Sequence, residues 1–319
     1  MLTTVDAPFL ARKMADCLMA REGVLQKHWS YDYSVVHRGM EMLYARTGER
    51  KYFDYIQRSL DAFLSPDGSE IRGYDLESHN LDFLCLGKQL LYLYRQTKEQ
   101  RYFTAASLLR RQLYSQPRTP EGGFWHKTTC AEQMWLDGLY MGGPIAAEYG
   151  ARFHQPEFLD ITVEQALLME KKTRDEKTGL WYHAWDSIKQ KEWADPVTGL
   201  SPEFWGRSIG WVPVAVLDDL DFLPETHPQF GEMQRLVKDL LTAVCKYQSE
   251  QGRWYQVVDK GGQEGNWLET SCSSLFVAAI CKAVRKGILP ESYMSYARKG
   301  YEGVIRSLNW DGEDLLVGD

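Results

Sequence analysis

Two aspartates occupy similar positions in two apolar segments of the chain. Asp82 lies in SHNLDFLCLGKQLL and Asp137 in EQMWLDGLYMGGP, 55 residues apart. If these segments form neighbouring helices, both carboxyls could face one pocket, and a carboxyl pair is what acid and base catalysis on a sugar requires. Acids near helix starts are equally expected for another reason, because they interact favourably with the helix dipole. Spacing alone leaves both interpretations open.

The surroundings of Asp137 favour a catalytic role. Trp135, Leu136, Leu139 and Met141 are its apolar neighbours in the sequence. We expect burial among them to raise the pKa of the Asp137 carboxyl, because a low dielectric disfavours the charged form. A carboxyl that keeps its proton near neutral pH can donate it to a substrate.

An arginine between tryptophans is a second candidate. Arg207 and Trp211 are four residues apart in FWGRSIGW, which places them on one helix face beside Trp205. A guanidinium held by indole rings can bind a carboxylate through two parallel hydrogen bonds. An arginine stacked in a structural ion pair is the alternative interpretation.

Histidines recur in connections that combine glycine with aromatic residues. His126 and Lys127 end EGGFWHK, and His183 lies in WYHAWD beside Trp185. If such connections line one shared opening, these side chains could contact a sugar. A single histidine is also commonly a structural hydrogen-bonding residue.

The elements that position these residues follow from a repeat of about fifty residues. Three segments pair a small turn with an aromatic helix start: TGERKYFDYIQRSLDAFL (47–64), TKEQRYFTAASLLRRQL (97–113) and HQPEFLDITVEQALLM (154–169). They are amphipathic, and they alternate with more apolar helices predicted at Tyr31–Arg46, His79–Arg95, Ala131–Gly150, Pro202–Leu220 and Leu268–Lys286.

Alternation of amphipathic and apolar helices predicts two layers, with the apolar helices inside. An opening helix at Phe9–Arg21 brings the count to six outer and five inner helices. The fold class is therefore all-α, since no segment alternates with period two for long enough to build a substantial sheet. Paired helices can form an open solenoid or a closed ring, and the repeated Gly-aromatic connections favour the ring.

Length and composition restrict the other possibilities. The chain has 319 residues, 44% of them hydrophobic, enough for a large core, and we expect a single domain over residues 1–319. A net charge of −7 with scattered basic residues argues against a nucleic-acid partner. No apolar stretch is long enough for a membrane span.

The start of the chain and the cysteines bear on the compartment. MLTTVDAPFLARKMADCL carries Asp6, Arg12 and Lys13 where a signal peptide needs an unbroken apolar segment, so we expect a cytoplasmic protein. The six cysteines include no CxxC pair, and most lie among apolar residues, which predicts free, largely buried thiols.

Motifs for cofactors are absent from the sequence. There is no HExxH, no Cys/His cluster at metal-ligand spacing, no GxGxxG after a strand and no P-loop. The sequence therefore predicts neither a metal nor a nucleotide cofactor.

Together, the motifs resemble the unsaturated rhamnogalacturonyl hydrolases of glycoside hydrolase family 105, whose relatives include the unsaturated glucuronyl hydrolases. The matching stretches span most of the chain in order: WSY at Trp29, LD at Asp82, PRTPEGGFWHK from Pro117, QMWLDGLYMGGP from Gln133, TGLWYHAWD from Thr178, TGLSPEFWGRSIGW from Thr198 and NWLETSCSSLF from Asn266.

The resemblance implies an (α/α)6 barrel with a deep pocket, without a metal, for the terminal Δ4,5-unsaturated galacturonic acid of a rhamnogalacturonan oligosaccharide. It implies that Asp137 is the general acid and base and that Asp82 is the second acidic residue. Substrate binding is implied for residues in or near the matching motifs, namely Tyr31, His126, Lys127, Trp135, His183, Trp205, Arg207 and Trp211.

The implied reaction is hydration of a double bond. Asp137 would protonate C4 of the C4=C5 bond, water would add at C5, and the resulting hemiketal would open and release the rest of the saccharide. The proton goes to an enol ether rather than to the glycosidic oxygen, so the usual rule that relates carboxyl separation to stereochemistry does not apply.

One departure from the family concerns the C-terminus. The sequence stops at Asp319, soon after NWDGEDLL, where the family would be expected to continue into a final inner helix. A shortened chain, or a ring left open on one side, would explain this.

Three rival functions remain open at the level of sequence. An unsaturated glucuronyl hydrolase would act on glycosaminoglycan fragments with the same chemistry. A non-catalytic sugar-binding protein would tolerate loss of Asp137, and an epimerase-like isomerase would depend on histidines. Asp82, His126, Asp137 and Arg207 occurring together favour a hydrolase.

Overall fold

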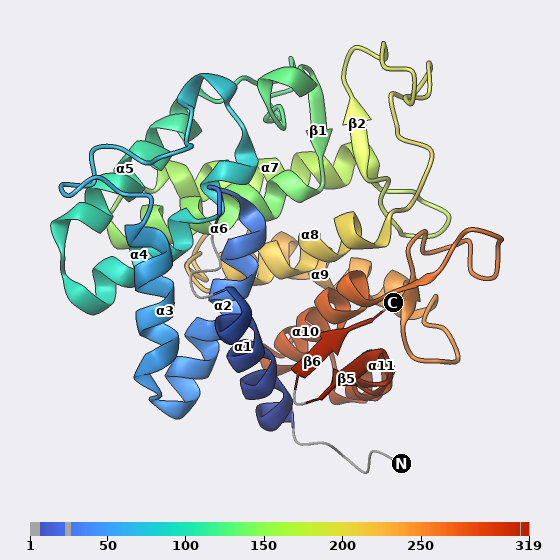
Figure 1. The fold of residues 1–319 in the computed structure, drawn as a ribbon. Coiled ribbons are helices and arrows are strands. Elements are labelled where there is room, and N and C mark those ends of the chain that lie inside the picture. Colours follow the sequence, from blue (N-terminus) through green and yellow to red (C-terminus); the bar gives the residue numbers. More distant parts are fainter. Residues whose placement is uncertain (1–6, 23–26, 313, 319) are drawn as a thin grey trace. The chain divides into compact units, whose positions relative to one another are not determined.

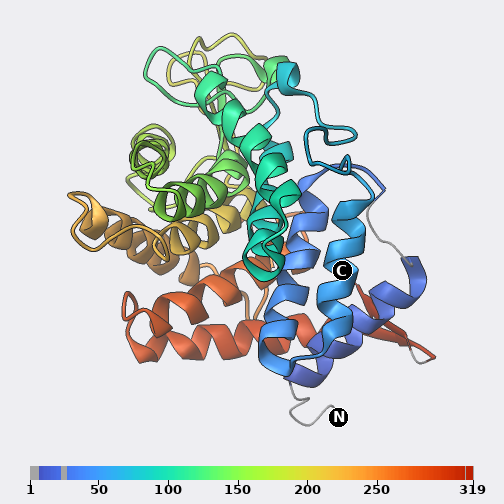
Figure 2. The ribbon, with the colours of Figure 1, turned by 90° about the vertical axis from the view of Figure 1, so that its left-hand side faces the viewer.

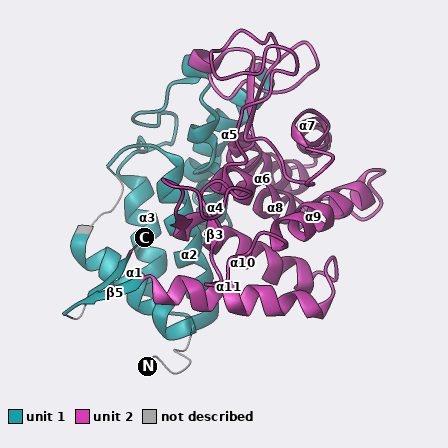
Figure 3. Ribbon diagram, turned by 90° about the vertical axis from the view of Figure 1, so that its right-hand side faces the viewer, with its two compact units in different colours: residues 1–114, 308–317 teal, residues 115–307, 318–319 magenta. Residues whose placement is uncertain are grey.

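A computed structural model describes residues 7–22, 27–312 and 314–318, and these form eleven α-helices and three two-stranded antiparallel sheets. The predicted fold class, all-α, is confirmed, and so is the number of helices. The chain divides into two compact units (Figure 3). Unit 1 comprises residues 1–114 and 308–317, and unit 2 comprises residues 115–307 and 318–319. Asp6 and Asp319 lie outside the described residues.

Unit 1 is built around α2, which packs against α1, α3 and α4. Helix α3 shows how the sequence specifies this packing, because its buried residues Tyr52, Phe53, Ile56 and Leu60 recur at helical spacing and leave a polar outer face. The helices are α1 (Ala7–Glu22), α2 (Tyr31–Thr47), α3 (Arg50–Asp61), α4 (Gly87–Thr97) and α5 (Gln100–Ser115), with 3-10 turns η1 (Leu76–Ser78) and η2 (Leu81–Leu84).

The C-terminal hairpin also belongs to unit 1. Strands β5 (Leu308–Asp311) and β6 (Asp314–Val317) pair in antiparallel register, and β6 packs against α1 (Figure 1). The Leu315 N–H donates to Cys17 Sγ at 3.4 Å, and Arg21 forms an ion pair with Asp314 at 3.1 Å. This hairpin was not predicted, because four-residue strands are too short for a clear period-two pattern.

Unit 2 contains the two predicted layers. Helix α8 packs against both α6 and α10, and α7, α9 and α11 pair with these three helices in turn (Figure 2). The helices are α6 (Asp137–Arg152), α7 (Glu157–Thr173), α8 (Gly206–Asp219), α9 (Phe230–Cys245), α10 (Thr270–Arg285) and α11 (Met294–Arg306), with 3-10 turns η3 (Thr128–Cys130) and η4 (Glu291–Tyr293). The strands are β1 (Gln133–Trp135) with β2 (Ala184–Asp186), and β3 (Trp254–Tyr255) with β4 (Leu268–Glu269).

Two glycines of FWGRSIGW allow α10 to approach α8 closely. A Cβ atom at Gly210 would lie 2.9 Å from the Leu275 side chain, and one at Gly206 would lie 3.1 Å from Cys272 Sγ. Real Cβ contacts are rarely this short, so larger residues would push the two helices apart. The glycines therefore set the distance between α8, which carries Arg207, and α10, which begins directly after Glu269.

Four of the predicted inner helices begin later than the apolar pattern indicates. The segments before Asp137, Gly206 and Thr270 include extended residues that form hydrogen bonds with other connections, whereas the segment before Gly87 contains the 3-10 turn η2. His79, predicted within a helix, has a φ of 42°. The affected predictions are His79–Arg95, Ala131–Gly150, Pro202–Leu220 and Leu268–Lys286, whose α-helices begin at Gly87, Asp137, Gly206 and Thr270.

All six cysteines are free, and four of them are buried, as the sequence predicts. Burial raises the pKa of the Cys245 thiol to about 12, which makes it a poor nucleophile. Within the described ranges, no helix is long and apolar enough to cross a membrane.

Candidate active site

A short ladder at the start of α6 brings Asp137 close to His183. Strand β1 pairs with β2 so that Trp135 lies opposite Ala184, and the Leu136 N–H donates to the His183 carbonyl at 3.0 Å. Helix α6 begins at the next residue. Asp137 therefore lies where strand β1 leads into α6, and His183 lies directly before the paired strand β2.

The Asp137 carboxyl is oriented by a serine from α8. Ser208 is wholly buried, and its hydroxyl donates to Asp137 Oδ2. Helices α6 and α8 pack side by side, so the backbone positions of both partners are set by helix packing. A serine hydroxyl can donate or accept, so it can hold the carboxyl both with and without its proton.

His183 is held as a neutral imidazole. Its Nδ1 lies 3.2 Å from the carbonyl oxygen of Glu203, and since a carbonyl only accepts, Nδ1 carries the hydrogen. Burial lowers the pKa of His183, although this hydrogen bond and the negative charges of Asp137 and Glu203 act in the opposite direction. Neutral His183 therefore offers a lone pair on Nε2 that can accept a hydrogen from a hydroxyl or a water.

Arg207 forms the ion pair that was the alternative prediction, while part of its side chain stays accessible. Its Nη1 lies 2.6 Å from Glu269 Oε1, and the guanidinium lies over the Trp205 ring, 4.5 Å from the centroid. Glu269 is buried and also accepts from the Cys272 N–H at the start of α10. The Arg207 side chain is 39% exposed, so further donors of the planar group can reach a ligand.

The two predicted tryptophans have different surroundings. Trp205 precedes α8, is half-buried and stacks with Arg207. Trp211 is buried and stacks on Tyr140 of α6, with ring centroids 4.7 Å apart and planes 25° apart. Trp211 thus contributes to the packing of α8 on α6.

Three other predicted residues of unit 2 form a cluster. The His126 ring stacks on Trp135 with centroids 4.7 Å apart and planes 8° apart, and Lys127 Nζ lies 5.8 Å from the centre of the same indole. The backbone N–H of His126 donates to the Gln133 carbonyl at 2.9 Å. The cluster is therefore attached to β1, the strand that leads directly into Asp137.

The predicted residues of unit 1 are Tyr31, at the start of an inner helix, and Asp82, in a 3-10 turn that precedes the next inner helix. Asp82 lies in η2, where its N–H donates to Asn80 Oδ1 at 3.1 Å, and Tyr31 is the first residue of α2. Both are half-buried. Asp82 and Asp137 belong to different units, so their predicted cooperation stays a prediction.

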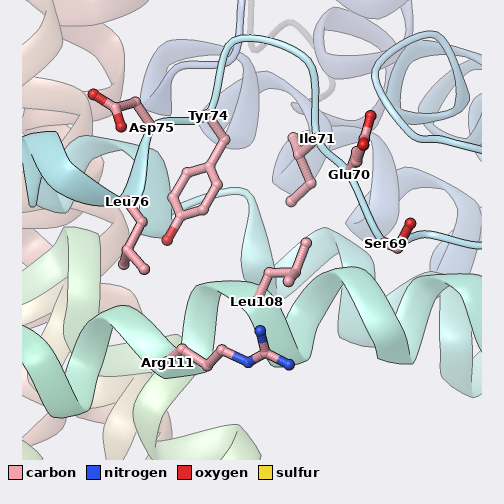
Figure 4. A pocket seen from close by; sticks show the side chains of 8 residues that line it. All are labelled: Ser69, Glu70, Ile71, Tyr74, Asp75, Leu76, Leu108 and Arg111. Atoms are coloured by element: carbon pink, nitrogen blue, oxygen red, sulfur yellow. The ribbon is translucent and has the colours of Figure 1, made fainter.

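Unit 1 also has a pocket of about 400 Å³ between the 69–76 segment and α5, and it was not predicted (Figure 4). The Tyr74 hydroxyl donates to Gln112 Oε1 at 3.1 Å, and Gln112 Nε2 donates to the Asn80 carbonyl at 3.0 Å. Burial raises the pKa of Tyr74. The lining residues are Ser69, Glu70, Ile71, Tyr74, Asp75, Leu76, Leu108 and Arg111.

Three residues with clear roles in this geometry were missed from sequence: Ser208, Glu203 and Glu269. Ser208 and Glu203 lie in TGLSPEFWGRSIGW and Glu269 lies in NWLETSCSSLF, so all three were inside recognised motifs. Ser208 and Glu269 are connected to the site by contacts between residues more than sixty positions apart, and Glu203 by a contact with His183, twenty positions earlier in the chain.

Among residues 7–22, 27–312 and 314–318, no three His, Cys, Asp or Glu side chains are grouped so that they could hold a metal ion.

A carboxyl at a helix start, with histidine, arginine and tryptophan side chains on neighbouring segments, is suited to acid and base catalysis on a sugar. Residues 10–318 match the family described as Glycosyl Hydrolase Family 88, and the chain belongs to this family.

Solved and curated relatives agree with this assignment. A glycoside hydrolase from family 105 of C. acetobutylicum ATCC 824 is 40% identical, with a TM-score of 0.91 over 95% of this chain and 84% of that one. The unsaturated rhamnogalacturonyl hydrolase YesR of Bacillus subtilis (strain 168) is 26% identical over 93% of this chain and 81% of its own length. The predicted resemblance to family 105 is confirmed.

A more distant structure shares the fold. The unsaturated glucuronyl hydrolase from Bacillus sp. GL1 is 14% identical, with a TM-score of 0.71 over 94% of this chain and 84% of that one. At this identity the likeness concerns the fold alone.

Proposed function

We propose that the protein is an unsaturated uronyl hydrolase that releases a terminal Δ4,5-unsaturated galacturonic acid from rhamnogalacturonan oligosaccharides. The observation that carries the proposal is the Asp137 carboxyl, which is oriented by buried Ser208 next to a neutral His183. The name of the curated relative YesR supports the rhamnogalacturonan substrate.

In the proposed reaction, Asp137 donates its proton to C4 of the C4=C5 double bond. The positive charge that develops at C5 is shared with the ring oxygen, and the water that adds at C5 gives up a proton to the Asp137 carboxylate. The product is a hemiketal, which opens to a ketone at C5. The remaining saccharide then leaves from C1, and the catalytic carboxyl has regained its proton.

Other side chains of unit 2 have proposed binding roles. Arg207 binds a polar group of the uronic acid through donors that remain beside its ion pair with Glu269. His183 accepts a hydroxyl or water hydrogen at Nε2. Trp135, on which the buried His126 ring stacks, provides an aromatic surface at the end of β1. Asp82 is proposed as the second acidic residue.

The decisive experiment follows the ultraviolet absorbance of the double bond. The purified protein is incubated separately with an unsaturated rhamnogalacturonan disaccharide and with an unsaturated chondroitin disaccharide, and Asp137→Asn is the control. We expect absorbance loss with the first substrate. Loss with chondroitin alone would identify a glucuronyl hydrolase instead, and no loss with either would indicate a non-catalytic sugar-binding protein.

A further inference from the structure

We propose that Trp193 forms a subsite for the leaving sugar, the unit attached to the unsaturated uronic acid. The proposed ligand is a neutral sugar, such as a hexose or a 6-deoxyhexose, that places an apolar face on the indole. This inference rests on the proposed function, because it takes Asp137 as the catalytic acid.

The first argument is position. The Trp193 ring centroid lies 6.5 Å from that of His183, with the planes 35° apart. His183 is close enough to Asp137 for the aspartate charge to act on its pKa, and its carbonyl accepts the N–H of Leu136, the residue before Asp137. Trp193 is thus separated from the catalytic carboxyl by one side chain, a spacing suited to the next sugar of an oligosaccharide.

The second argument is that the loop carrying Trp193 is anchored at its base. Asp186 is wholly buried and accepts backbone N–H groups of Gln190 at 2.7 Å and Lys191 at 2.9 Å. On the returning side, the Trp185 indole N–H donates to the Thr198 carbonyl at 3.0 Å. A loop closed by such contacts can hold an aromatic ring in place before the ligand arrives, which reduces the entropy cost of binding.

Internal turns strengthen the same loop. The Ala194 N–H donates to the Lys191 carbonyl at 3.0 Å, so the chain turns around Trp193. Asp195 accepts from the Val197 and Thr198 N–H groups at 2.9 and 2.7 Å. Trp193 itself stays partly accessible within this otherwise exposed, polar segment.

The chemistry of the two rings indicates the class of ligand. An indole presents an uncharged flat face against which the C–H groups of a sugar can pack. His183 next to it is neutral and has an acceptor at Nε2 for a sugar hydroxyl. An apolar surface beside one hydrogen-bond acceptor suits a neutral sugar, because neither ring carries a formal charge to attract a carboxylate.

The test compares two substrates that share the unsaturated galacturonic acid. In one it is linked to rhamnose, and in the other to a methyl group that cannot reach a second subsite. We expect Trp193→Ala to raise KM for the disaccharide about tenfold, the factor expected when about 50 Å² of apolar contact is lost. The kcat/KM for the methyl glycoside should change less than about twofold, because this substrate has no second sugar to contact the indole.

Ile188→Ala is the matched control, because Ile188 is an exposed apolar residue of the same loop. This variant should leave both substrates unaffected. Trp193→Phe keeps a flat ring and should restore most of the disaccharide affinity. If Trp193→Ala does not fold, Trp193→Phe and Trp193→Leu supply the same comparison between a ring and an aliphatic side chain.

The outcomes distinguish the two proposals. If the wild-type protein hydrolyses neither substrate, the proposed function fails before the subsite is reached. If the protein is active and Trp193→Ala impairs both substrates equally, Trp193 supports the catalytic residues rather than the leaving sugar, and the inference is overturned. Unchanged kinetics on both substrates would overturn it as well.

Discussion

Replacing Ser208 by alanine tests whether α8 holds the carboxyl of Asp137, the proposed catalytic residue, in position. The substitution removes one buried oxygen atom, the donor to Asp137 Oδ2, and leaves the helix backbone intact. A hydrogen bond to a charged group contributes roughly 1.5 to 3 kcal/mol, and about 1.4 kcal/mol corresponds to a tenfold change in rate. We therefore expect kcat to fall by about 10- to 100-fold.

The split between kcat and KM separates positioning from substrate binding. Ser208 is wholly buried, so it should not contact the sugar, and KM should change little. A purely structural role would lower the melting temperature and leave kcat of the folded enzyme unchanged.

The matched control is Ser34→Ala, which changes a wholly buried helical serine in unit 1 that donates to Gln89 Oε1 at 2.6 Å. Both variants lose one buried hydroxyl, so thermal unfolding should report similar small losses of stability. Only Ser208→Ala should alter the steady-state kinetics, measured as loss of the double bond's absorbance between pH 5 and 9. A normal kcat in Ser208→Ala would refute the positioning role.

Three further predictions concern single side chains. Asp137→Asn should fold normally and lose most activity, because the amide cannot donate the proton; near-normal turnover would remove Asp137 from its role, and loss in Asp82→Asn alone would reverse the two. Arg207→Lys should lower kcat/KM by about 5- to 150-fold, whereas an arginine with only a structural role would change the melting temperature and spare the kinetics. Burial lowers the pKa of His37 to about 3, so folding keeps it neutral, and stability should fall as pH drops below 6.5, by about 3 kcal/mol at pH 4.5. Urea unfolding of His37→Leu should show a weaker pH dependence, and an unchanged one would contradict this account.

Helix number and helix layering could be predicted from sequence because they depend on local spacing. The buried face of α3, for example, can be recognised from residues three or four positions apart. The start of α6 could not be predicted in this way. Met134, Trp135 and Leu136 continue the apolar pattern, but Met134 and Trp135 form a strand that pairs with residues 184–185, about fifty positions later.

Some residues of the candidate site could be predicted from local motifs, and others could not. The motifs indicated Asp137, His183 and Arg207, whose side chains have suitable chemistry. The structure shows Asp137 and His183 on neighbouring segments of the chain. The orienting hydroxyl of Ser208 could not be identified, because a serine within an apolar helix has no distinctive pattern of its own. Ser208 meets Asp137 because α8 packs on α6, and this packing depends on contacts between residues that are far apart in the sequence.

Arg207 shows why a residue's type and neighbours do not decide between a structural and a binding role. The sequence left an ion pair and a carboxylate clamp as alternatives, and the structure contains the ion pair, with buried Glu269 as partner. This pair does not exclude ligand binding, because a guanidinium has five N–H donors in a plane, and one carboxylate does not use all of them. Glu269 instead fixes the direction of that plane over Trp205, and it offsets the positive charge. A uronic acid would then be recognised mainly by the geometry of the remaining donors, which is a property that lysine cannot reproduce.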